Sequence, residues 1–487
     1  MSMNGSNKII SIILSIILAI ILSNNSISAE NTWDSNFIPN SDLNGNINYI
    51  SMRLDSKDQP HICYIDRSNN LEKNYDFFYI YKNQDVWYKE IIDTNDNVGF
   101  YCSIDIDGND KPHVSYYDQE NGSLKYAKKI DDRWIIQIVD NQSDTGYYSS
   151  IKIDNDNNPH ISYYDGTTPY GLKYAFYNET NNWTAVKIDS GYGVGYDTSI
   201  DVDDSNNPRI SYFDYYHNNN SLRYAYKDGE NWFFKTVDVE GSMGFGSSLD
   251  IDNKNIPHIS YHDSTNNKIK YAYLSNEKWI TQNIEKTGEE LRENCIILDS
   301  KNLPHITYTK VDDKKIIKHA YWNGKNWETQ VLGEGINPII DLRNDGYPYI
   351  IYRDLKENKL KEIFSTILIS KPNGGETWYK GNIYDIEWKT DKDYQEIIIE
   401  LTKNNEIYQV LNDNLKINTF SWNISNNITS GEYNIKIKDI NNRIFATKTI
   451  KIEEKIDPEI SINPILGVLF IVFIAILLLI YFRWRKR

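Results

Sequence analysis

The chain of 487 residues has only three cysteines, Cys63, Cys102 and Cys295. This number is too small and too odd for a disulfide framework, and it allows one bridge at most, whose partners the sequence does not assign. Clusters of positive charge are also lacking, because the formal net charge is −16 and the basic residues are scattered. No basic stripe can therefore neutralise a phosphate backbone, and we expect no nucleic-acid partner.

Motifs for cofactors and metals are lacking as well. The sequence has no phosphate-binding loop, no Ser-His-Asp order and no cluster with metal-ligand spacing, so we expect neither a cofactor nor a metal. The segment from Asp105 to Asp110 is loosely similar to a calcium loop, but it lacks the glycine spacing and the terminal glutamate. For this segment we favour Asx turns, in which an aspartate binds backbone amides of its own hairpin.

Long hydrophobic runs are confined to the two ends of the chain. Residues 1–29 contain an apolar run from Ile9 to Leu22 and a small-residue cleavage site, which indicates a signal peptide. Residues 465–482 form an uncharged stretch that is long enough to cross a bilayer as one helix, and the tail 483–487 is basic. We therefore expect a single-pass protein of the cell membrane, with its body outside and a short cytoplasmic tail.

What the chain has in abundance is tyrosine, with 38 residues, and one phrase that occurs seven times at spacings of 44 to 52 residues. The phrase is Pro-His-Ile-Ser-Tyr in its commonest form, and it begins at Pro60, Pro112, Pro159, Pro208, Pro257, Pro304 and Pro348. Turn-rich segments divide each full repeat into four short strands. The sequence therefore predicts an all-β fold, with a seven-bladed β-propeller over residues 30–365.

The tryptophans predict how this ring closes. One tryptophan opens the fourth strand of each repeat, and the series is Trp33, Trp87, Trp134, Trp183, Trp232, Trp279 and Trp327. Trp33 has no repeat in front of it, whereas the seventh repeat ends after three strands. The segment after Glu30 is therefore predicted to pair with the third strand of the seventh repeat and to complete the last blade.

Residues that recur in all seven repeats are expected to be structural. In each phrase the branched residue and the final tyrosine share one face of the strand, while the second and fourth residues share the other. We expect the large face of one blade to pack on the small face of the next, with a partner for any buried hydroxyl.

A second module is predicted over residues 366–453, where short alternating runs indicate a β-sandwich. The phrase Asn373-Gly-Gly-Glu-Thr-Trp378, followed by Tyr384 and Trp388, resembles the immunoglobulin-like module of the Ser/Thr-rich GPI-anchored cell-wall protein family. The resemblance implies a stalk or spacer, which a linker over residues 454–464 would join to the transmembrane helix.

A candidate ligand site lies on one rim of the predicted ring. Gly-aromatic pairs precede the innermost strands, and an aspartate follows the second strand of most repeats. The candidate residues are Phe100, Tyr147, Tyr196, Phe245, Asp118, Asp165, Asp214 and Asp263. Aromatic faces beside carboxylates suit a sugar, which stacks its C–H faces on rings and donates hydroxyls to oxygen acceptors. The alternative is structural, with the aromatic residues shaping the loops and the aspartates capping hairpins.

The repeats resemble the propellers of the broad sialidase-repeat and fucose-lectin-like class of surface proteins. The segment from Ser103 to Gly108 matches a sialidase Asp-box only in part, and the sialidase arginine triad has no counterpart. Three functions stay open: a surface protein that binds a glycan or envelope protein without catalysis, a structural envelope scaffold, and a carbohydrate-active enzyme. A glycosidase needs only two opposed carboxylates, and the chain has many acids.

Overall fold

The computed structural model describes residues 33–43, 49–67, 75–83, 86–95, 97–177, 182–215, 220–239, 243–288, 293–344, 346–364, 367–372, 374–390, 397–403, 406–415, 419–439 and 444–455. These residues fall into an N-terminal body, Trp33–Ser365, and a C-terminal body that begins at Thr366. The predicted signal peptide 1–29, the transmembrane segment 465–482 and the tail 483–487 lie outside the described residues. Within them, no helix has the length and apolar character that a membrane crossing requires.

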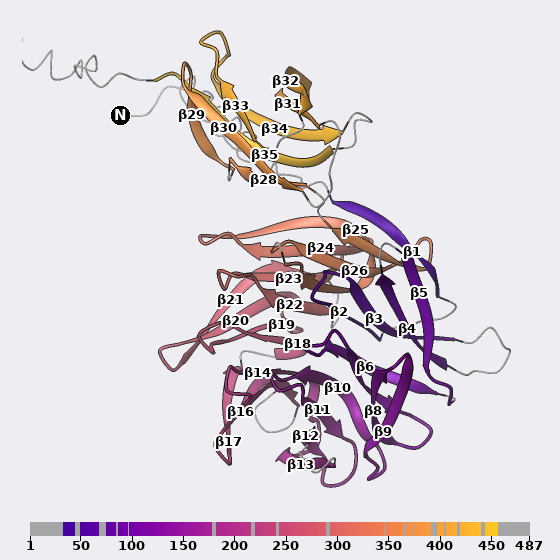
Figure 1. Ribbon diagram of the computed structural model, residues 1–487. Coiled ribbons are helices and arrows are strands. Elements are labelled where there is room, and N and C mark those ends of the chain that lie inside the picture. The colour runs from indigo at the N-terminus through magenta and orange to yellow at the C-terminus, as the bar shows by residue number, and fades with distance from the viewer. Residues whose placement is uncertain are drawn as a thin grey trace, which may run out of the picture. The chain divides into compact units, whose positions relative to one another are not determined.

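Every regular element of the described chain is a β-strand, so the predicted all-β class is confirmed. Repeats 1 to 5 each form one antiparallel sheet of four strands. From the innermost strand outward, repeats 1 to 3 are β2 (Ile50–Leu54), β3 (Pro60–Arg67), β4 (Tyr75–Asn83) and β5 (Val86–Asp93); β6 (Val98–Ile106), β7 (Pro112–Asp118), β8 (Ser123–Ile130) and β9 (Arg133–Asp140); and β10 (Thr145–Ile153), β11 (Pro159–Asp165), β12 (Gly171–Tyr177) and β13 (Trp183–Ser190). Repeats 4 and 5 are β14 (Val194–Val202), β15 (Pro208–Asp214), β16 (Ser221–Asp228) and β17 (Asn231–Asp238); and β18 (Met243–Ile251), β19 (Pro257–Asp263), β20 (Lys268–Ser275) and β21 (Lys278–Lys286). Figure 1 shows the first strand of each sheet toward the middle of the body and the fourth toward its edge.

Repeats 6 and 7 are joined into one seven-stranded sheet by the long strand β25 (Trp327–Leu342). The sheet contains β22 (Asn294–Leu298), β23 (Pro304–Val311), β24 (Lys315–Trp322), β25, β26 (Pro348–Asp354), β27 (Lys359–Phe364) and β1 (Asp34–Asp42). The first half of β25 pairs with β24 as the outer strand of repeat 6, and its second half pairs with β26 as the inner strand of repeat 7. Each repeat therefore still has four strands.

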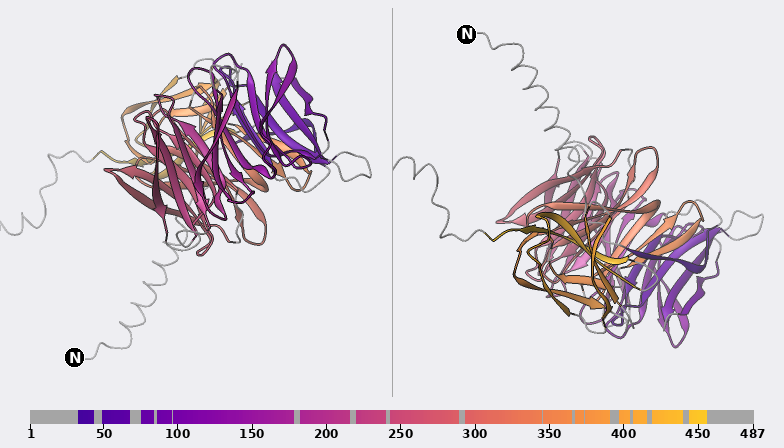
Figure 2. Two further views of the ribbon diagram at one scale, coloured as in Figure 1. Left: turned by 90° about the horizontal axis from the view of Figure 1, so that it is seen from below. Right: turned by 90° about the horizontal axis from the view of Figure 1, so that it is seen from above.

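The N-terminal strand β1 completes repeat 7, as the position of Trp33 predicts. β1 pairs antiparallel with β27, and Figures 1 and 2 show this indigo strand beside the orange end of the body. The indole of Trp33 donates to the side-chain oxygen of Gln330 on the outer strand of repeat 6, over 3.2 Å. Trp183 donates to Gln137 in the same way over 3.0 Å. Trp33 thus stands where the other repeats begin their fourth strand.

The recurring tyrosines lie buried between neighbouring repeats, as their presence in every repeat predicts. The hydroxyl of Tyr116 donates to Asp93, at the end of the preceding outer strand, over 2.8 Å, and Lys125 donates to the same carboxylate. The same trio recurs as Tyr163, Asp140 and Lys173; Tyr212, Asp189 and Arg223; Tyr261, Asp238 and Lys270; and Tyr308, Glu285 and Lys318. A charge-assisted hydrogen bond therefore fastens each of these tyrosines to the previous repeat.

The first hairpins of repeats 1 to 6 have the predicted Asx geometry, whereas repeat 7 has Arg343 at the aspartate position. Asp107 accepts the backbone amides of Asn109 and Lys111 through one carboxylate oxygen, both over 2.9 Å. The turns are also bonded to one another, because the amide of Gly108 donates to the side chain of Asn157 in the next repeat. Equivalent bonds run from Ser56 to Asp110, Asn155 to Asn206, Asp204 to Asn255, Asn253 to Asn302 and Asn344 to Asp58. The last of these joins repeat 7 to repeat 1.

The C-terminal body consists of two sheets around one core. One sheet contains β28 (Ile367–Lys371), β30 (Ile383–Thr390) and β33 (Thr419–Asn423), and the other contains β29 (Glu376–Tyr379), β35 (Ile444–Glu453), β34 (Gly431–Asp439), β31 (Ile397–Lys403) and β32 (Glu406–Leu415). Trp378, which ends the Asn-Gly-Gly-Glu-Thr-Trp phrase, and the following Trp388 are buried in this core. Trp378 stacks on Tyr384 with ring centroids 4.6 Å apart. The phrase therefore supplies the packing of the module.

Candidate functional site

The innermost strands of the seven repeats surround a central channel. A cavity of about 310 Å³ lies in it, lined by residues of β2, β6, β10, β14, β18, β22 and β25 and by Glu293 beside β22. Because side chains alternate along a strand, every second residue of these strands faces the channel. The channel wall is therefore built of layers, and each layer takes one residue from each repeat.

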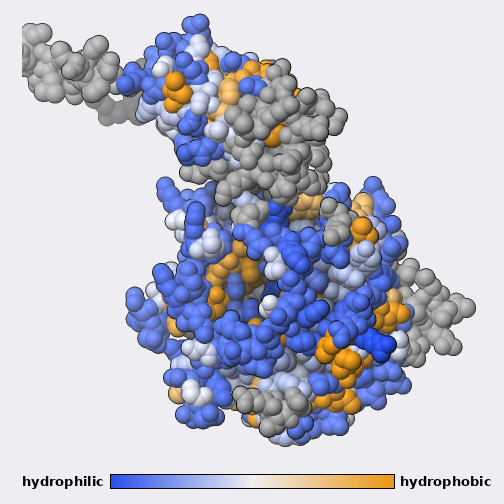
Figure 3. Space-filling model, in the orientation of Figure 1, coloured by the Kyte–Doolittle hydropathy of each residue, from blue (hydrophilic) through white to orange (hydrophobic). Residues whose placement is uncertain are grey.

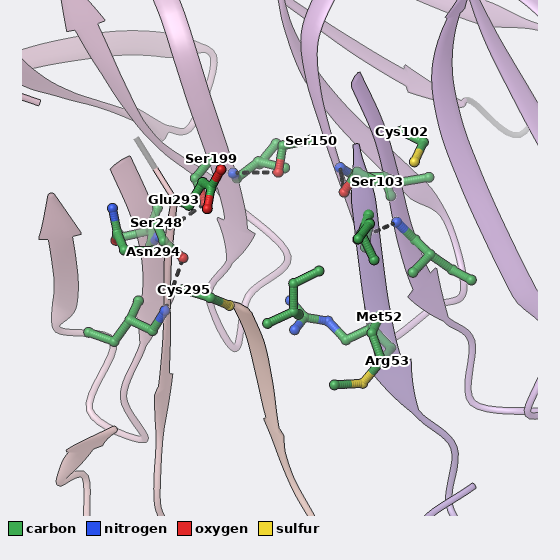
Figure 4. A pocket seen from close by; sticks show the side chains of 18 of the residues that line it. Met52, Arg53, Cys102, Ser103, Ser150, Ser199, Ser248, Glu293, Asn294 and Cys295 are labelled. Carbon is green, nitrogen blue, oxygen red and sulfur yellow. Dashed lines mark hydrogen bonds between the residues drawn. The ribbon is translucent and has the colours of Figure 1, made fainter. Parts of the chain in front are cut away.

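The middle layer is mostly serine. In Figure 4, Ser150, Ser199 and Ser248 lie on successive strands around the cavity. The hydroxyl oxygen of Ser199 accepts the amide of Leu249 in the next repeat over 3.0 Å, and the other serines do the same. This layer therefore bonds the inner strands to one another. Cys295 takes the serine position in repeat 6.

A charged layer lies two residues further along each strand. It consists of Arg53, Asp105, Lys152, Asp201, Asp250 and Asp341, with Ile297 in repeat 6. Lys152 pairs with Asp201 over 2.9 Å. Burial and the neighbouring Asp201 raise the pKa of Asp250 to about 7. Carboxylates of this layer accept backbone amides of the next repeat, as Asp250 does from Leu298 over 2.7 Å. The acids of this layer therefore belong to the wall.

The layer at the opposite end of the channel differs between repeats. Repeats 1 to 3 place Tyr49, Tyr101 and Tyr148 there, and their neighbouring ring centroids are 4.5 Å and 4.7 Å apart. Repeats 4 to 7 place Asp197, Gly246, Glu293 and Asn337 there. This end of the channel, which we call the mouth, is therefore aromatic on one side and polar with two carboxyls on the other.

A bulge in the inner strands produces the mouth. The pairing of β6 with β7 shifts its register between Phe100 and Ser103, and the first of the two residues between them, Tyr101, has a φ of 53°. Tyr148 and Asp197 have φ values of 54° and 48° at the same point. A bulge re-aims side chains locally, and these backbone conformations are costly for non-glycine residues. The strained backbone conformation therefore recurs at the position where the identity of the mouth residue differs between repeats.

The mouth residues converge electrostatically although they come from different repeats. Burial first, and then neighbours that include Tyr148 and Asp197, raise the pKa of Tyr49. Burial also raises the pKa of Glu293, whose carboxylate accepts the amide of Asn337 over 2.6 Å. Tyr49 belongs to repeat 1 and Asp197 to repeat 4, and Asp197 accepts the amide of Gly246 in repeat 5 over 3.0 Å. Rings and carboxyls thus face a common space.

The predicted rim aromatics lie one residue before the mouth residues and pack between repeats. Tyr147 packs on Tyr117 of the preceding repeat with ring centroids 4.3 Å apart, and Phe245 packs on Phe213 at 4.0 Å. Phe100, Tyr147 and Tyr196 are half-buried, while Phe245 is buried. These rings therefore pack between repeats, as the structural alternative holds, and buried Phe245 has little open face for stacking.

The four predicted rim aspartates are buried and bonded to their own hairpins or to nearby cations. Asp118 accepts the amide of Asn121 over 3.0 Å and pairs with Lys125 over 2.7 Å. Although burial raises it, these partners hold the pKa of Asp118 below its usual range. Asp165 pairs with Lys187, Asp214 with Arg223, and Asp263 binds Asn266. Their contacts match the capping alternative.

The sequence prediction did not include the mouth residues, because it selected the aromatic residue of each Gly-aromatic pair and not the residue that follows it. Each Gly-aromatic pair is followed by a residue that changes from repeat to repeat: Tyr101, Tyr148, Asp197 and Gly246. That variation, beside an otherwise regular phrase, is the signal that could have located the mouth.

The four-stranded sheets of the N-terminal body fit a β-propeller. No family model and no curated protein matches the chain. Among solved structures, it is similar to AofleA from Arthrobotrys oligospora, with 10% identity and a TM-score of 0.43 over 63% of this chain and 92% of that one. It is similar to the polysaccharide lyase Uly1, with 10% identity and a TM-score of 0.42 over 71% and 95% of the two chains. The SapL1 lectin, solved with alpha methyl fucoside, has 12% identity and a TM-score of 0.41 over 55% and 94%. Likeness at this level says nothing about ligand or reaction.

Proposed function

We propose that the protein is a surface protein that binds a glycan, without catalysis, at the mouth of its central channel. The observation that carries the proposal is the mouth itself, where Tyr49, Tyr101 and Tyr148 face Asp197 and Glu293. Rings stack on the C–H faces of a sugar, and carboxylates accept its hydroxyls. The face of the body seen in Figure 3 is largely hydrophilic, with hydrophobic residues in small separate areas, which suits a polar ligand.

The architecture in this proposal is a seven-bladed propeller, an immunoglobulin-like spacer and a membrane anchor. The turn-to-turn bonds support seven blades, because they run from repeat to repeat and return from Asn344 to Asp58. The burial of Trp378 and Trp388 in one core between two sheets supports the immunoglobulin-like module. The signal peptide 1–29 and the helix 465–482 rest on the sequence alone, and with them the proposed location at the cell membrane.

Binding is favoured over catalysis by the state of the rim acids. A glycosidase on the rim would need an opposed pair with one raised pKa. Asp118 has a lowered pKa, and Asp165 and Asp214 are paired with cations. Glu293 and Asp250 do have raised pKa values, but both carboxylates are bonded within the body. Glu293 accepts the amide of Asn337 and the hydroxyl of Thr309, and Asp250 lies in the channel wall, where it accepts the amide of Leu298.

The test is a glycan array probed with the purified full chain. We expect binding to a defined set of glycans and its loss in the variant Tyr101→Ala, whereas Asp118→Asn retains it. A thermal melt shows whether each variant is folded. Failure to bind any glycan would overturn the proposal.

A further inference from the structure

An exposed group of tyrosines stands on the same rim as the mouth. Tyr192 lies in the loop that leads into β14, and Tyr170 and Tyr215 lie in or beside the loops between the second and third strands of repeats 3 and 4. Tyr192 and Tyr215 are 52% and 51% exposed. The ring centroids of Tyr170 and Tyr192 are 5.1 Å apart. Large aromatic rings that are this open are available for stacking.

A continuous row of tyrosines connects this group to the mouth. Burial first, and then neighbours that include Tyr192, raise the pKa of Tyr196, and the rings of Tyr196 and Tyr148 are 5.3 Å apart. The row continues from Tyr148 to Tyr101 at 4.7 Å and from Tyr101 to Tyr49 at 4.5 Å. Apart from Tyr192, its members are half-buried, so part of each ring stays accessible. The row thus spans repeats 4 to 1, and repeats 5 to 7 place no tyrosine in the mouth.

The charge along the row is acidic. Asp197 follows Tyr196 and accepts the amide of Gly246 over 3.0 Å, and Asp144 accepts the hydroxyl of Tyr117 beside Tyr147 over 3.2 Å. The cations of the same rim are engaged, because Lys187 pairs with Asp165 over 2.9 Å and Arg223 bonds two aspartates. An acidic row repels a polyanion and accepts neutral hydroxyls or ammonium groups.

We propose that the row from Tyr192 to Tyr49, which we call the tyrosine track, holds one extended glycan chain of neutral or amino sugars. The inference rests on the proposed function and narrows it to a chain instead of a single sugar. One end of the chain lies at the mouth, beside Asp197, and the other lies on Tyr192. Because only one such track exists among the described residues, each protein molecule binds one chain.

The experiment is calorimetric titration of the full chain with cello-oligosaccharides and chitosan oligosaccharides of two and six residues. We expect one site per chain and an affinity that rises with length. Tyr192→Ala should weaken the six-residue ligand by roughly tenfold, the effect of losing one stacking contact, and leave the two-residue ligand unchanged. Tyr192→Phe, which keeps the ring, should retain the affinity.

The matched control is Tyr88→Ala, because Tyr88 is 44% exposed on the outer strand of repeat 1, away from the track. It should bind like the unaltered chain. If two and six residues bind equally and Tyr192→Ala has no effect, the track is overturned while glycan binding stands. Equal binding of a polygalacturonate hexamer would overturn the choice of neutral or amino sugars. If none of these ligands binds and an array is also negative, the proposed function itself fails.

Discussion

The hydroxyl of Tyr352 lies over Gly333, 2.5 Å from the point where a Cβ at residue 333 would stand. Gly333 pairs with Ile317, and the same position of repeat 5 pairs Glu285 with Ile269. Glu285 accepts the hydroxyl of the next repeat's tyrosine, as the other outer-strand acids do. Among the described residues, no group accepts a hydrogen bond from the hydroxyl of Tyr352. In repeat 7 the tyrosine therefore contributes the packing of its aromatic ring and no hydrogen bond from its hydroxyl.

This difference predicts that the same substitution has unequal effects in two repeats. Tyr352→Phe removes an unbonded hydroxyl, so the free energy of unfolding should change by less than about 0.5 kcal/mol. Tyr163→Phe removes the 2.7 Å bond to Asp140 and should cost about 1–2 kcal/mol. Urea unfolding of both variants measures the difference, and equal losses would contradict the assignment.

Gly346 offers a site for stabilisation. It has a φ of 82° at the turn position where other repeats place an asparagine or aspartate that accepts the neighbouring turn's amide. Because Gly346 has no side chain, it cannot accept a hydrogen bond from the turn of repeat 6. The amide that would donate this bond belongs to Ser300. A Cβ here would meet nothing within 4 Å, and asparagine tolerates this conformation.

We therefore expect Gly346→Asn to raise the free energy of unfolding by about 0.5–1.5 kcal/mol through one new bond between repeats 6 and 7. Gly346→Ala is the control, because it adds backbone strain without an acceptor and should lower stability. Denaturant melts compare the two variants. A gain with alanine, or none with asparagine, would refute the missing bond.

Asp118 is predicted to matter for folding and not for binding. Asp118→Ala removes the cap on Asn121 and one partner of the buried Lys125, which should cost about 1–3 kcal/mol. Glu120→Ala, at an exposed position of the same turn, should change stability by less than about 0.5 kcal/mol. Chemical unfolding gives both values, and titration with a bound glycan should show equal affinities for the two variants.

The channel predicts a pH effect that can be isolated at one residue. Burial and Asp201 raise the pKa of Asp250 to about 7, so the folded protein holds this proton more tightly than the unfolded chain. The stabilisation is full below the unfolded pKa of about 4 and is lost as the pH rises through about 7. Asp250→Asn stays uncharged and should avoid that loss.

We expect the variant to be more stable than the unaltered protein at pH 8, on the order of 1–3 kcal/mol, with the difference shrinking toward pH 5. Buried histidines such as His113, whose pKa burial lowers to about 4, act in the opposite direction, since their contribution is lost as the pH falls. These histidines are present in both the unaltered protein and Asp250→Asn, so their contributions cancel in the difference between the two unfolding free energies. Unfolding free energies at several pH values provide the measurement, and a constant difference would argue against the raised pKa.

The buried thiols Cys63 and Cys102 occupy a position that other repeats give to hydroxyls. Their counterparts Ser115 and Ser149 lie 3.0 Å apart, oxygen to oxygen, across the next junction. Burial, and then the contact with Cys102, raises the pKa of the Cys63 thiol. The double variant Cys63→Ser, Cys102→Ser should restore the hydroxyl pair and change stability by less than about 1 kcal/mol. A thermal melt is sufficient, and a loss above about 3 kcal/mol would contradict the equivalence.

The sequence predicted what the repeats share. Pro60 and its six counterparts open the second strand of each repeat, and the spacing of Trp33 placed β1 beside β27. Both depend on local patterns that recur, so they can be read from one chain. The partner of each buried tyrosine could not, because the acid lies 23 residues away on another sheet, as Asp93 does from Tyr116.

The sequence placed the candidate site on the rim that carries the mouth, at positions next to the mouth residues. Alternation along a strand places Phe100 and Tyr101 on opposite faces, and choosing between them requires knowing where the bulge falls. The register shift between Phe100 and Ser103 is set by pairing with β7 and is not visible in the sequence. The same holds for Asp118, whose acidic side chain suits a ligand site until its bond to Lys125 is seen.

The placement of β27 gives the closing strand a mechanical role. The chain passes from β27 into the C-terminal body, so any pull on that body enters the propeller through this strand. β27 is hydrogen-bonded to β26 on one side and to β1 on the other. Extraction of β27 must therefore break two ladders of hydrogen bonds instead of one, and the strand that carries the attachment is held more firmly than an edge strand would be.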